Sequence, residues 1–275
     1  MYLHAFMIII LQVFFVLVLL VLLIQFVYKP KRAKGATQLP DHYKELLTDY
    51  VKFYSQLDEE GKKHFEERLQ RFLTSVKITE ANAIAEDLDK VLIAAGAIIP
   101  VYYIPDWEYI NLHEVLLYPG TFNQDFDQQG MQRPILGMVG TGAMQNVMII
   151  SKWELRQGFI NHTSSRNVAL HEFVHLIDLM DGTLDGVPEI LLERKYVPQW
   201  LKIVNSTIMQ IKAGESDIDF YGATNQVEFF AVVSEYFFEQ PRLLKENHRE
   251  VYEMLEKIFG ERKTGNLRTA TIASS

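Results

Sequence analysis

The chain has 275 residues, of which 48% are hydrophobic and 23% are charged, and this balance is typical of a folded globular protein. Its formal net charge of −8 does not favour a nucleic-acid partner, because attraction to phosphates requires a basic surface. The absence of cysteine excludes disulfide bonds and cysteine-ligated zinc, so any metal ligands must be His, Asp or Glu.

The N-terminal stretch, residues 3–28, is almost continuously apolar and exceeds the roughly 20 residues that a membrane helix needs. It lacks a preceding Lys or Arg and a following small-residue cleavage site, which disfavours a signal peptide. Residues 29–40 begin with a cluster of basic residues, and such charge gathers on the cytoplasmic side of membranes. The sequence predicts a single transmembrane anchor over residues 1–28, a basic juxtamembrane linker over 29–40, and a cytoplasmic domain; a buried core helix is the alternative.

The first part of this domain is predicted to be helical. Residues 41–75 carry apolar side chains at helical spacing, which indicates two helices with a break near residues 58–61. Thr79 is suited to cap a further helix over residues 79–95. Beyond Ile98 the period changes, and four short segments rich in β-branched and aromatic residues are predicted to be strands: residues 101–104, 114–118, 134–139 and 146–151.

The second part is again helical, and its first helix directly follows the last predicted strand. Ser165 or Asn167 is suited to cap this helix, and a Gly-rich turn over residues 181–188 ends it. Further helices are predicted over residues 198–213, 228–239 and 247–259, with a loop at 219–225 and a flexible tail over 261–275.

The first of these helices contains the motif His-Glu-x-x-His at residues 171–175. In a helix, His171 and His175 project from one face one turn apart, so their imidazoles can bind one Zn²⁺. Glu172 lies beside them and is placed to take a proton from a metal-activated water, as in metallopeptidases. The alternative is a buried helix with hydrogen-bonded histidines, which must account for polar side chains in an otherwise apolar run.

A catalytic zinc site needs a third protein ligand and an open position. Here the third ligand must come from another element. Glu228 and Glu235 are seven residues apart and face the same way on a helix whose face is otherwise Val and aromatic. Carboxylates on such an apolar face are unfavourable without a partner, so both acids are expected to be paired or to bind a metal.

Two blocks of this sequence resemble the Mlc titration factor A family of zinc-dependent peptidases. The first is NVALHEFVHLID at residues 167–178, followed by Asp181-Gly182 and by residues 186–188. The second is YGATNQVEFFAVVSEYFFEQP at residues 221–241, and LYPG at 117–120 adds a weaker match. The second block is also similar to the catalytic domain of anthrax lethal factor, a distant zincin relative.

The resemblance covers about residues 45–260 and implies an α+β fold, a mainly helical zincin-like domain with a small sheet, which we assign to residues 41–260. It implies that His171, His175 and Glu228 bind zinc, that Glu172 is the general base, and that Tyr221 assists at the oxyanion. It further implies a peptide or protein substrate and a transcriptional regulator as a partner, since the family's known partner is a glucose-responsive repressor. The predicted anchor is absent from the soluble family members.

Other polar residues near the motif have two interpretations each. Tyr221 is either catalytic or a core or capping residue. Asp178 either orients a ligand imidazole or is a surface acid at the helix end. Glu235 is predicted to support a ligand, with a structural salt bridge as the alternative. His162 and His248 are predicted to be surface histidines and not ligands. The aromatic side chains around Glu228 and Glu235 are predicted to be core and not a substrate pocket.

We therefore interpret the chain as a membrane-anchored, zinc-dependent metallopeptidase with its catalytic domain in the cytoplasm and residues 3–28 in the lipid bilayer. One alternative is a membrane-tethered binding protein that sequesters a cytoplasmic transcriptional regulator. Another is a zinc hydrolase that acts on small amides.

Overall fold

The computed structural model describes residues 39–81, 84–120, 137–139, 146–161 and 165–261. The predicted anchor, all but the last two residues of the predicted linker, and nearly all of the predicted tail lie outside these ranges. Among the helices that the structure describes, none has both the length and the apolar composition of a membrane span.

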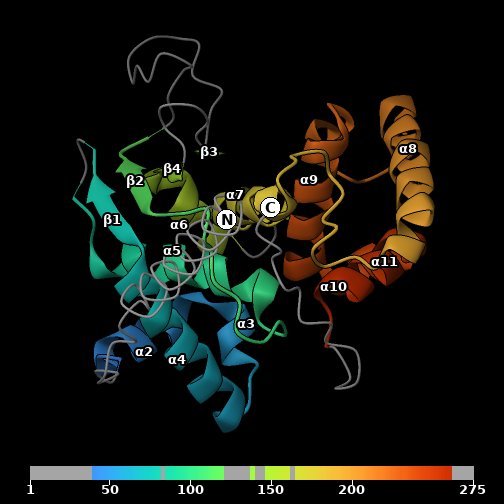
Figure 1. The fold of residues 1–275 in the computed structure, drawn as a ribbon. Helices are drawn as coiled ribbons and strands as arrows, with labels where there is room; N and C mark the ends of the chain where they lie inside the picture. Colours follow the sequence, from blue (N-terminus) through green and yellow to red (C-terminus); the bar gives the residue numbers. More distant parts are fainter. Residues whose placement is uncertain (1–38, 82–83, 121–136, 140–145, 162–164, 262–275) are drawn as a thin grey trace, which may run out of the picture. The chain divides into compact units, whose positions relative to one another are not determined.

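The described chain is α+β, mainly helical with one small sheet (Figure 1). Its strands are β1 (Lys77–Glu80), β2 (Glu114–Tyr118), β3 (Gly137–Val139) and β4 (Val147–Ser151). Its α-helices are α2 (Asp41–Tyr50), α3 (Lys52–Ser55), α4 (Glu59–Ser75), α5 (Asp87–Ile98), α6 (Lys152–Ile160), α7 (Val168–Asp178), α8 (Val197–Ala213), α9 (Gln226–Glu239), α10 (Pro241–Asn247) and α11 (Arg249–Phe259). Short 3-10 helices are η1 (Ile99–Val101), η3 (Leu179–Asp181), η4 (Arg194–Tyr196) and η5 (Phe220–Ala223).

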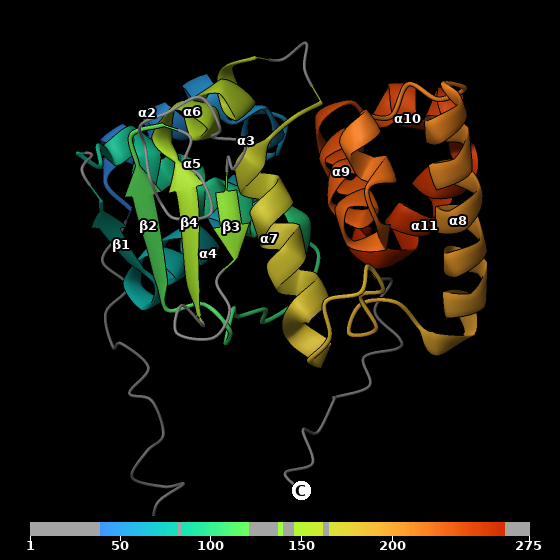
Figure 2. The same cartoon turned by 90° about the horizontal axis from the view of Figure 1, so that it is seen from above.

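The four strands form one sheet in the order β1-β2-β4-β3. Strands β1, β2 and β4 are parallel, whereas β3 pairs antiparallel with β4 at the edge of the sheet. Figure 2 shows β3 beside α7, and residues of the two elements are in contact. The edge of the sheet therefore meets the helix that carries the histidine motif.

Helix α7 packs on both sides. In Figure 2 the sheet and helices α2–α6 lie on one side of α7, and α8–α11 lie on the other. On the sheet side, the Phe173 ring contacts the rings of Phe72 and Tyr109 at centroid distances of 5.6 and 5.2 Å. On the other side, α7 contacts α9 along its length. This burial agrees with the nearly continuous apolar sequence of α7.

Several sequence predictions are confirmed. Strands β2 and β4 match the predicted ranges 114–118 and 146–151, and β3 matches the end of the range 134–139. The break at residues 58–61 is confirmed, since the Asp58 carboxylate accepts the N–H of Gly61 at 2.8 Å and caps α4. A further break separates α2 from α3.

The predicted helix over residues 79–95 is wrong at its start. Thr79 lies in β1, which pairs with β2, a strand far away in the sequence. Helix α5 begins only at Asp87, where Glu86 and Asp89 form a reciprocal capping box. Local propensity did not reveal the strand, because its pairing partner is not local.

The predicted strand over residues 101–104 is also wrong. This segment continues from α5 as the 3-10 helix η1 and a turn. The buried Arg68 side chain satisfies two of its carbonyl groups, those of Val101 and Tyr102, with hydrogen bonds of 2.7 and 2.8 Å. A side chain far away in the sequence thus takes the role that a neighbouring strand would have.

Two helices were not predicted. Helix α6 separates β4 from α7, so the interpretation that the last strand directly precedes the motif helix is wrong. Ser151 ends β4 and caps α6, because its hydroxyl accepts the N–H of Glu154 at 3.3 Å. Helix α10 starts at Pro241, which ends α9 as predicted but also occupies the first helical position, where proline is tolerated.

Candidate metal centre

Helix α7 presents the two motif histidines on one face, as their spacing predicts. Asn167 caps the helix, because its side-chain oxygen accepts the N–H of Leu170 at 3.3 Å. Ser165, the other predicted cap, does not occupy the N-cap position. The rings of His171 and His175 meet edge to face with centroids 4.6 Å apart. Both imidazoles are available to a partner on the neighbouring helix.

That partner is Glu228, in the first turn of α9. Asn225 caps α9 by accepting the N–H of Glu228 at 2.9 Å, which fixes where the helix begins. The Oε2 atom of Glu228 lies 3.0 Å from Nε2 of His171 and 3.5 Å from Nε2 of His175. One ligand atom from each of these three residues lies within 4.8 Å of the others.

The second acid of α9, Glu235, supports this cluster from behind. Its Oε1 lies 2.7 Å from Nδ1 of His171, and its Oε2 accepts the N–H of Asn167 at 2.5 Å. A carboxylate on Nδ1 fixes the orientation of the ring and leaves Nε2 directed at Glu228. Glu235 itself is not part of the cluster of three, and it interacts with a histidine as a supporting residue would.

The carboxylates dominate the electrostatics of the two histidines. Burial would lower the pKa of His171, but Glu235 and Glu228 outweigh it and raise this pKa well above 6.5. Burial would likewise raise the pKa of Glu228, but its contacts with His171 and His175 lower it to about 2. The negative charge that a cation requires is therefore already present between the two imidazoles.

Glu172 is buried between α7 and strand β3. A Cβ atom on Gly137 would lie 2.6 Å from Oε1 of Glu172 and 2.7 Å from its Cγ, so a glycine at this position leaves the room that the carboxylate occupies. Burial raises the pKa of Glu172 above 4.5, while the neighbouring histidines oppose this shift. A carboxyl group with a raised pKa is suited to accept a proton and give it back.

Tyr221 lies next to His171 and is half exposed. Its ring centroid is 5.9 Å from that of His171, and 51% of the residue is exposed. Burial, followed by the negative charges of Glu228 and Glu172, raises the pKa of its hydroxyl to about 12, so it remains a proton donor at neutral pH. The alternative that Tyr221 is a core residue is wrong.

Asp178 is fully buried, so its interpretation as a surface acid is wrong. Its Oδ2 accepts the N–H of Gly186 at 2.7 Å, and burial raises its pKa to about 7. Its Oδ1 and the Nδ1 of His175 are both buried without a hydrogen-bond partner in the described structure. Asp178 is thus near the second histidine in sequence, but no hydrogen bond joins the two side chains.

The remaining predictions concern residues away from the cluster. His248 is partly buried, with a side chain 10% exposed and 2.6 Å from Asp217, and it is not one of the clustered residues, as predicted. His162 lies outside the described residues. The aromatic residues around Glu228 and Glu235 belong to the core or pack against it, as predicted.

Sequence reasoning missed three residues that position the cluster. They are Gly137, Asn167 as a hydrogen-bond donor to α9, and Glu239, whose Oε1 accepts from the Asn167 side chain at 2.9 Å. The signal for Glu239 was present, because it follows Glu235 by four residues and therefore shares its helix face. No local pattern indicates Gly137, because the contact depends on how β3 meets α7.

The three clustered residues fit a metal ion of the zinc type. Two imidazole nitrogens and one carboxylate oxygen form a ligand set of catalytic zinc sites, which leave a fourth position open. The bond between His171 and Glu235 is the second interaction that metal-ligating histidines commonly make. In the part of the chain that the structure describes, this is the one such group of His, Asp and Glu.

Comparison with known proteins gives a matching family and several relatives. The family described as glucose-regulated metallo-peptidase M90 matches residues 27–260. An uncharacterised protein of Synechocystis is 30% identical over 236 residues, which cover 80% of this chain and 84% of that protein. Mlc titration factor A of Escherichia fergusonii is 27% identical over 214 residues, 73% of this chain and 79% of that protein. Mlc titration factor A of Pectobacterium atrosepticum is 29% identical over 175 residues, 58% and 63% respectively.

Proposed function

The chain belongs to the glucose-regulated metallo-peptidase M90 family, and from this premise we propose that it hydrolyses peptide bonds with one zinc ion held by His171, His175 and Glu228. The observation that carries the proposal is the position of Glu228 Oε2, 3.0 and 3.5 Å from the Nε2 atoms of the two histidines. A binding protein would not need Glu172, buried beside these ligands with a raised pKa.

Each side chain then has a defined task. Bound zinc supplies Lewis acidity, which makes water a nucleophile near neutral pH. Glu172 accepts the proton of the attacking water and later delivers it to the leaving amine. Tyr221 donates a hydrogen bond to the oxyanion that forms on the substrate carbonyl. Glu235 holds the His171 ring in place through Nδ1.

The setting of the enzyme is also a proposal. The apolar run over residues 3–28, followed by basic residues, supports a single-pass anchor with the peptidase domain, residues 41–260, in the cytoplasm. A reporter that is active only after export can be fused to the C-terminus. Activity of this reporter would contradict the proposed orientation. The name Mlc titration factor A, which several relatives carry, supports a transcriptional regulator as a partner or substrate.

The proposed function is tested by replacing the base. Glu172→Gln nearly keeps the shape of the side chain, so the full-length protein in detergent should fold and bind zinc. Its peptide cleavage should fall by roughly 10²- to 10⁴-fold, because proton transfer is lost. Bound zinc, thermal midpoint and cleavage of a peptide library should be measured together.

The matched control is Glu215→Gln, which changes an exposed acid away from the cluster and should leave all three quantities unchanged. Removal of zinc by a chelator should abolish cleavage, and added zinc should restore it. A Glu172→Gln protein that is folded, zinc-loaded and as fast as the wild type would rule out the proposed mechanism.

A further inference from the structure

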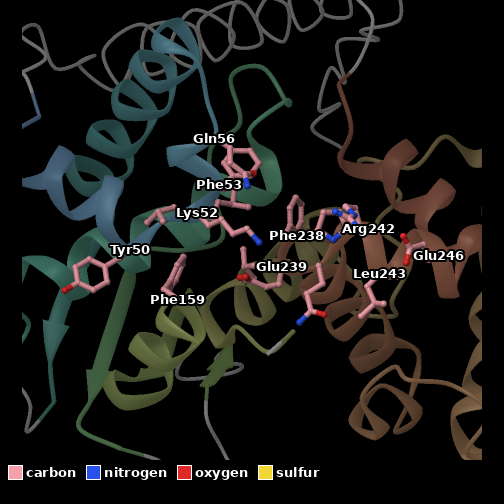
Figure 3. A pocket seen from close by; sticks show the side chains of 15 residues that line it. Tyr50, Lys52, Phe53, Gln56, Phe159, Phe238, Glu239, Arg242, Leu243 and Glu246 are labelled. Atoms are coloured by element: carbon pink, nitrogen blue, oxygen red, sulfur yellow. The ribbon is translucent and has the colours of Figure 1, made fainter. Parts of the chain in front are cut away.

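A cavity of about 530 Å³ lies where helix α3 faces the junction of α9 and α10 (Figure 3). Its volume falls within the roughly 300–1,000 Å³ typical of small-molecule sites. None of the three clustered residues lines it, and neither does Glu172. The cavity is therefore separate from the candidate metal centre.

The walls of the cavity are partly aromatic. Phe53 of α3, Phe159 of α6 and Phe238 of α9 line it, together with Leu170 of α7. These side chains come from four different helices, so the space is formed by the tertiary fold. An apolar group placed between them would be removed from water on several sides.

Two cations, Lys52 and Arg242, border the same cavity. Both are exposed, and neither forms an ion pair with any residue that the structure describes. Figure 3 shows them from opposite walls, Lys52 from α3 and Arg242 from α10. The exposed carboxylate of Glu246 lies one helical turn beyond Arg242 and is not paired with it in the structure. Within the described part of the chain, both cations are therefore available to bind an anionic group.

A carboxylate forms the inner wall. The Oε1 atom of Glu239 accepts one hydrogen bond, from the Asn167 side chain at 2.9 Å. Burial raises the pKa of Glu239 to about 7, while Asn167 and Lys52 oppose this shift. Lys52 acts on Glu239 only across the cavity, because the two groups are not in ion-pair contact. A partly buried carboxylate that accepts one hydrogen bond from the described residues favours a cation as a further partner.

We propose that this cavity binds a small zwitterion with an apolar body, such as a free apolar amino acid or a short peptide of such residues. Its ammonium group would bind Glu239, its carboxylate would bind Lys52 and Arg242, and its apolar part would lie among the phenylalanine rings. The binding itself does not depend on the proposed peptidase function. If that function holds, products of the reaction belong to the class of ligand that the cavity accepts.

The cavity is connected to the candidate metal centre by hydrogen bonds. Glu239 binds the side chain of Asn167, the N–H of Asn167 binds Glu235 at 2.5 Å, and Glu235 binds Nδ1 of His171 at 2.7 Å. A ligand that engages Glu239 acts on the first member of this chain. We expect its affinity to differ between zinc-free and zinc-loaded protein, and linkage then requires zinc affinity to change by the same factor.

The test is calorimetric titration of the full-length protein in detergent with L-phenylalanine and L-leucine. Two analogues serve as probes of the charged groups: N-acetyl-phenylalanine lacks the ammonium group, and phenylalaninamide lacks the carboxylate. Each should bind at least about tenfold more weakly than phenylalanine, because each leaves a charged group of the protein without its partner. Equal binding of the three compounds, or no binding of either amino acid, would overturn the proposal.

Variants locate the site. Glu239→Gln and the double variant Lys52→Ala/Arg242→Ala should each weaken phenylalanine binding at least about tenfold, since each removes a charge-assisted contact. Lys212→Ala, which removes an exposed cation of α8, should bind as the wild type does. The double variant changes only exposed side chains, so it keeps the test decisive if Glu239→Gln fails to fold. Unchanged binding in the double variant would contradict the assignment.

The same titration should be repeated in the Glu172→Gln protein. Binding there, in a protein without cleavage, would support the site independently of the proposed function. Equal affinity for phenylalanine in the zinc-free and zinc-loaded wild type would refute the connection to the metal centre.

Discussion

Helix α7 is held differently on its two flanks. On the sheet side, strand β3 offers Glu172 no side chain at Gly137, where a Cβ would lie 2.6 Å from the carboxylate. On the helical side, α9 offers two carboxylates: Glu228 meets both imidazoles, and Glu235 meets His171 and the backbone of Asn167. The sheet flank leaves room for Glu172 because Gly137 has no side chain, whereas the helical flank makes hydrogen bonds to α7.

This difference matters because the two flanks touch groups with different tasks. The sheet flank determines where the candidate base lies, whereas the helical flank determines where the candidate ligands lie. Changes on the sheet flank should therefore lower the rate of cleavage and leave zinc binding intact. Changes on the helical flank should lower zinc affinity first.

The largest effect is expected from Gly137→Ala. The added methyl group overlaps Oε1 and Cγ of Glu172, so the carboxylate must move away from its position. The rate of cleavage should fall by up to roughly 10²- to 10⁴-fold, the loss expected for removal of the base. Zinc affinity should stay unchanged. The rate and the metal content should be measured on the same sample.

Met138→Ala is the matched control, since it changes the next residue of the strand, whose side chain points to the opposite face. It should retain most of the activity. If Gly137→Ala lost zinc together with activity, the distinction between the two flanks would not hold.

The next effect concerns the far end of α7, where Asp178 accepts the N–H of Gly186. Burial raises the pKa of Asp178 from 3.8 to about 7, so the folded protein holds this proton more tightly than the unfolded chain. The stability that this gives is present below pH 4 and is lost as the pH rises to 7. A shift of this size corresponds to about 4 kcal/mol at most.

Asp178→Asn should therefore reduce the loss of unfolding free energy between pH 4 and pH 7. Denaturant unfolding of the zinc-free protein at several pH values would measure it. Some pH dependence should remain, because burial also raises the pKa of Glu239 to about 7. Identical pH profiles for the wild type and Asp178→Asn would show that Asp178 does not contribute.

The smallest of the three effects is expected from Glu235→Gln. The amide keeps the size of the side chain but weakens the charge-assisted contact with His171, so zinc affinity should fall by roughly 10- to 100-fold. Competition with a chelator would measure the change. Glu228→Ala is the comparison, because it removes a proposed ligand and should prevent stoichiometric zinc binding. The reverse order of the two affinities would exchange the roles assigned to Glu228 and Glu235.

The sequence was most informative where the physical signal is local. The spacing of His171 and His175 predicted a shared helix face, and the apolar run around them predicted a buried helix. Three of the helices after residue 196, α8, α9 and α11, follow the 3.6-residue period, so their existence and approximate ends were predictable, whereas α10 was not predicted. The presence of Glu228 and Glu235 on one helix face was predictable for the same reason.

The tertiary structure decided what depends on contacts between distant segments. Thr79 lies in a strand because β1 pairs with β2. Residues 101–104 form no strand, and Arg68 instead binds the carbonyl groups of Val101 and Tyr102. Glu228 lies between the histidines, and Gly137 against Glu172, only because α9 and β3 pack on opposite sides of α7. Local propensity carries no information about such packing, since the free energy that selects it comes from burial and hydrogen bonds between segments far apart in the chain.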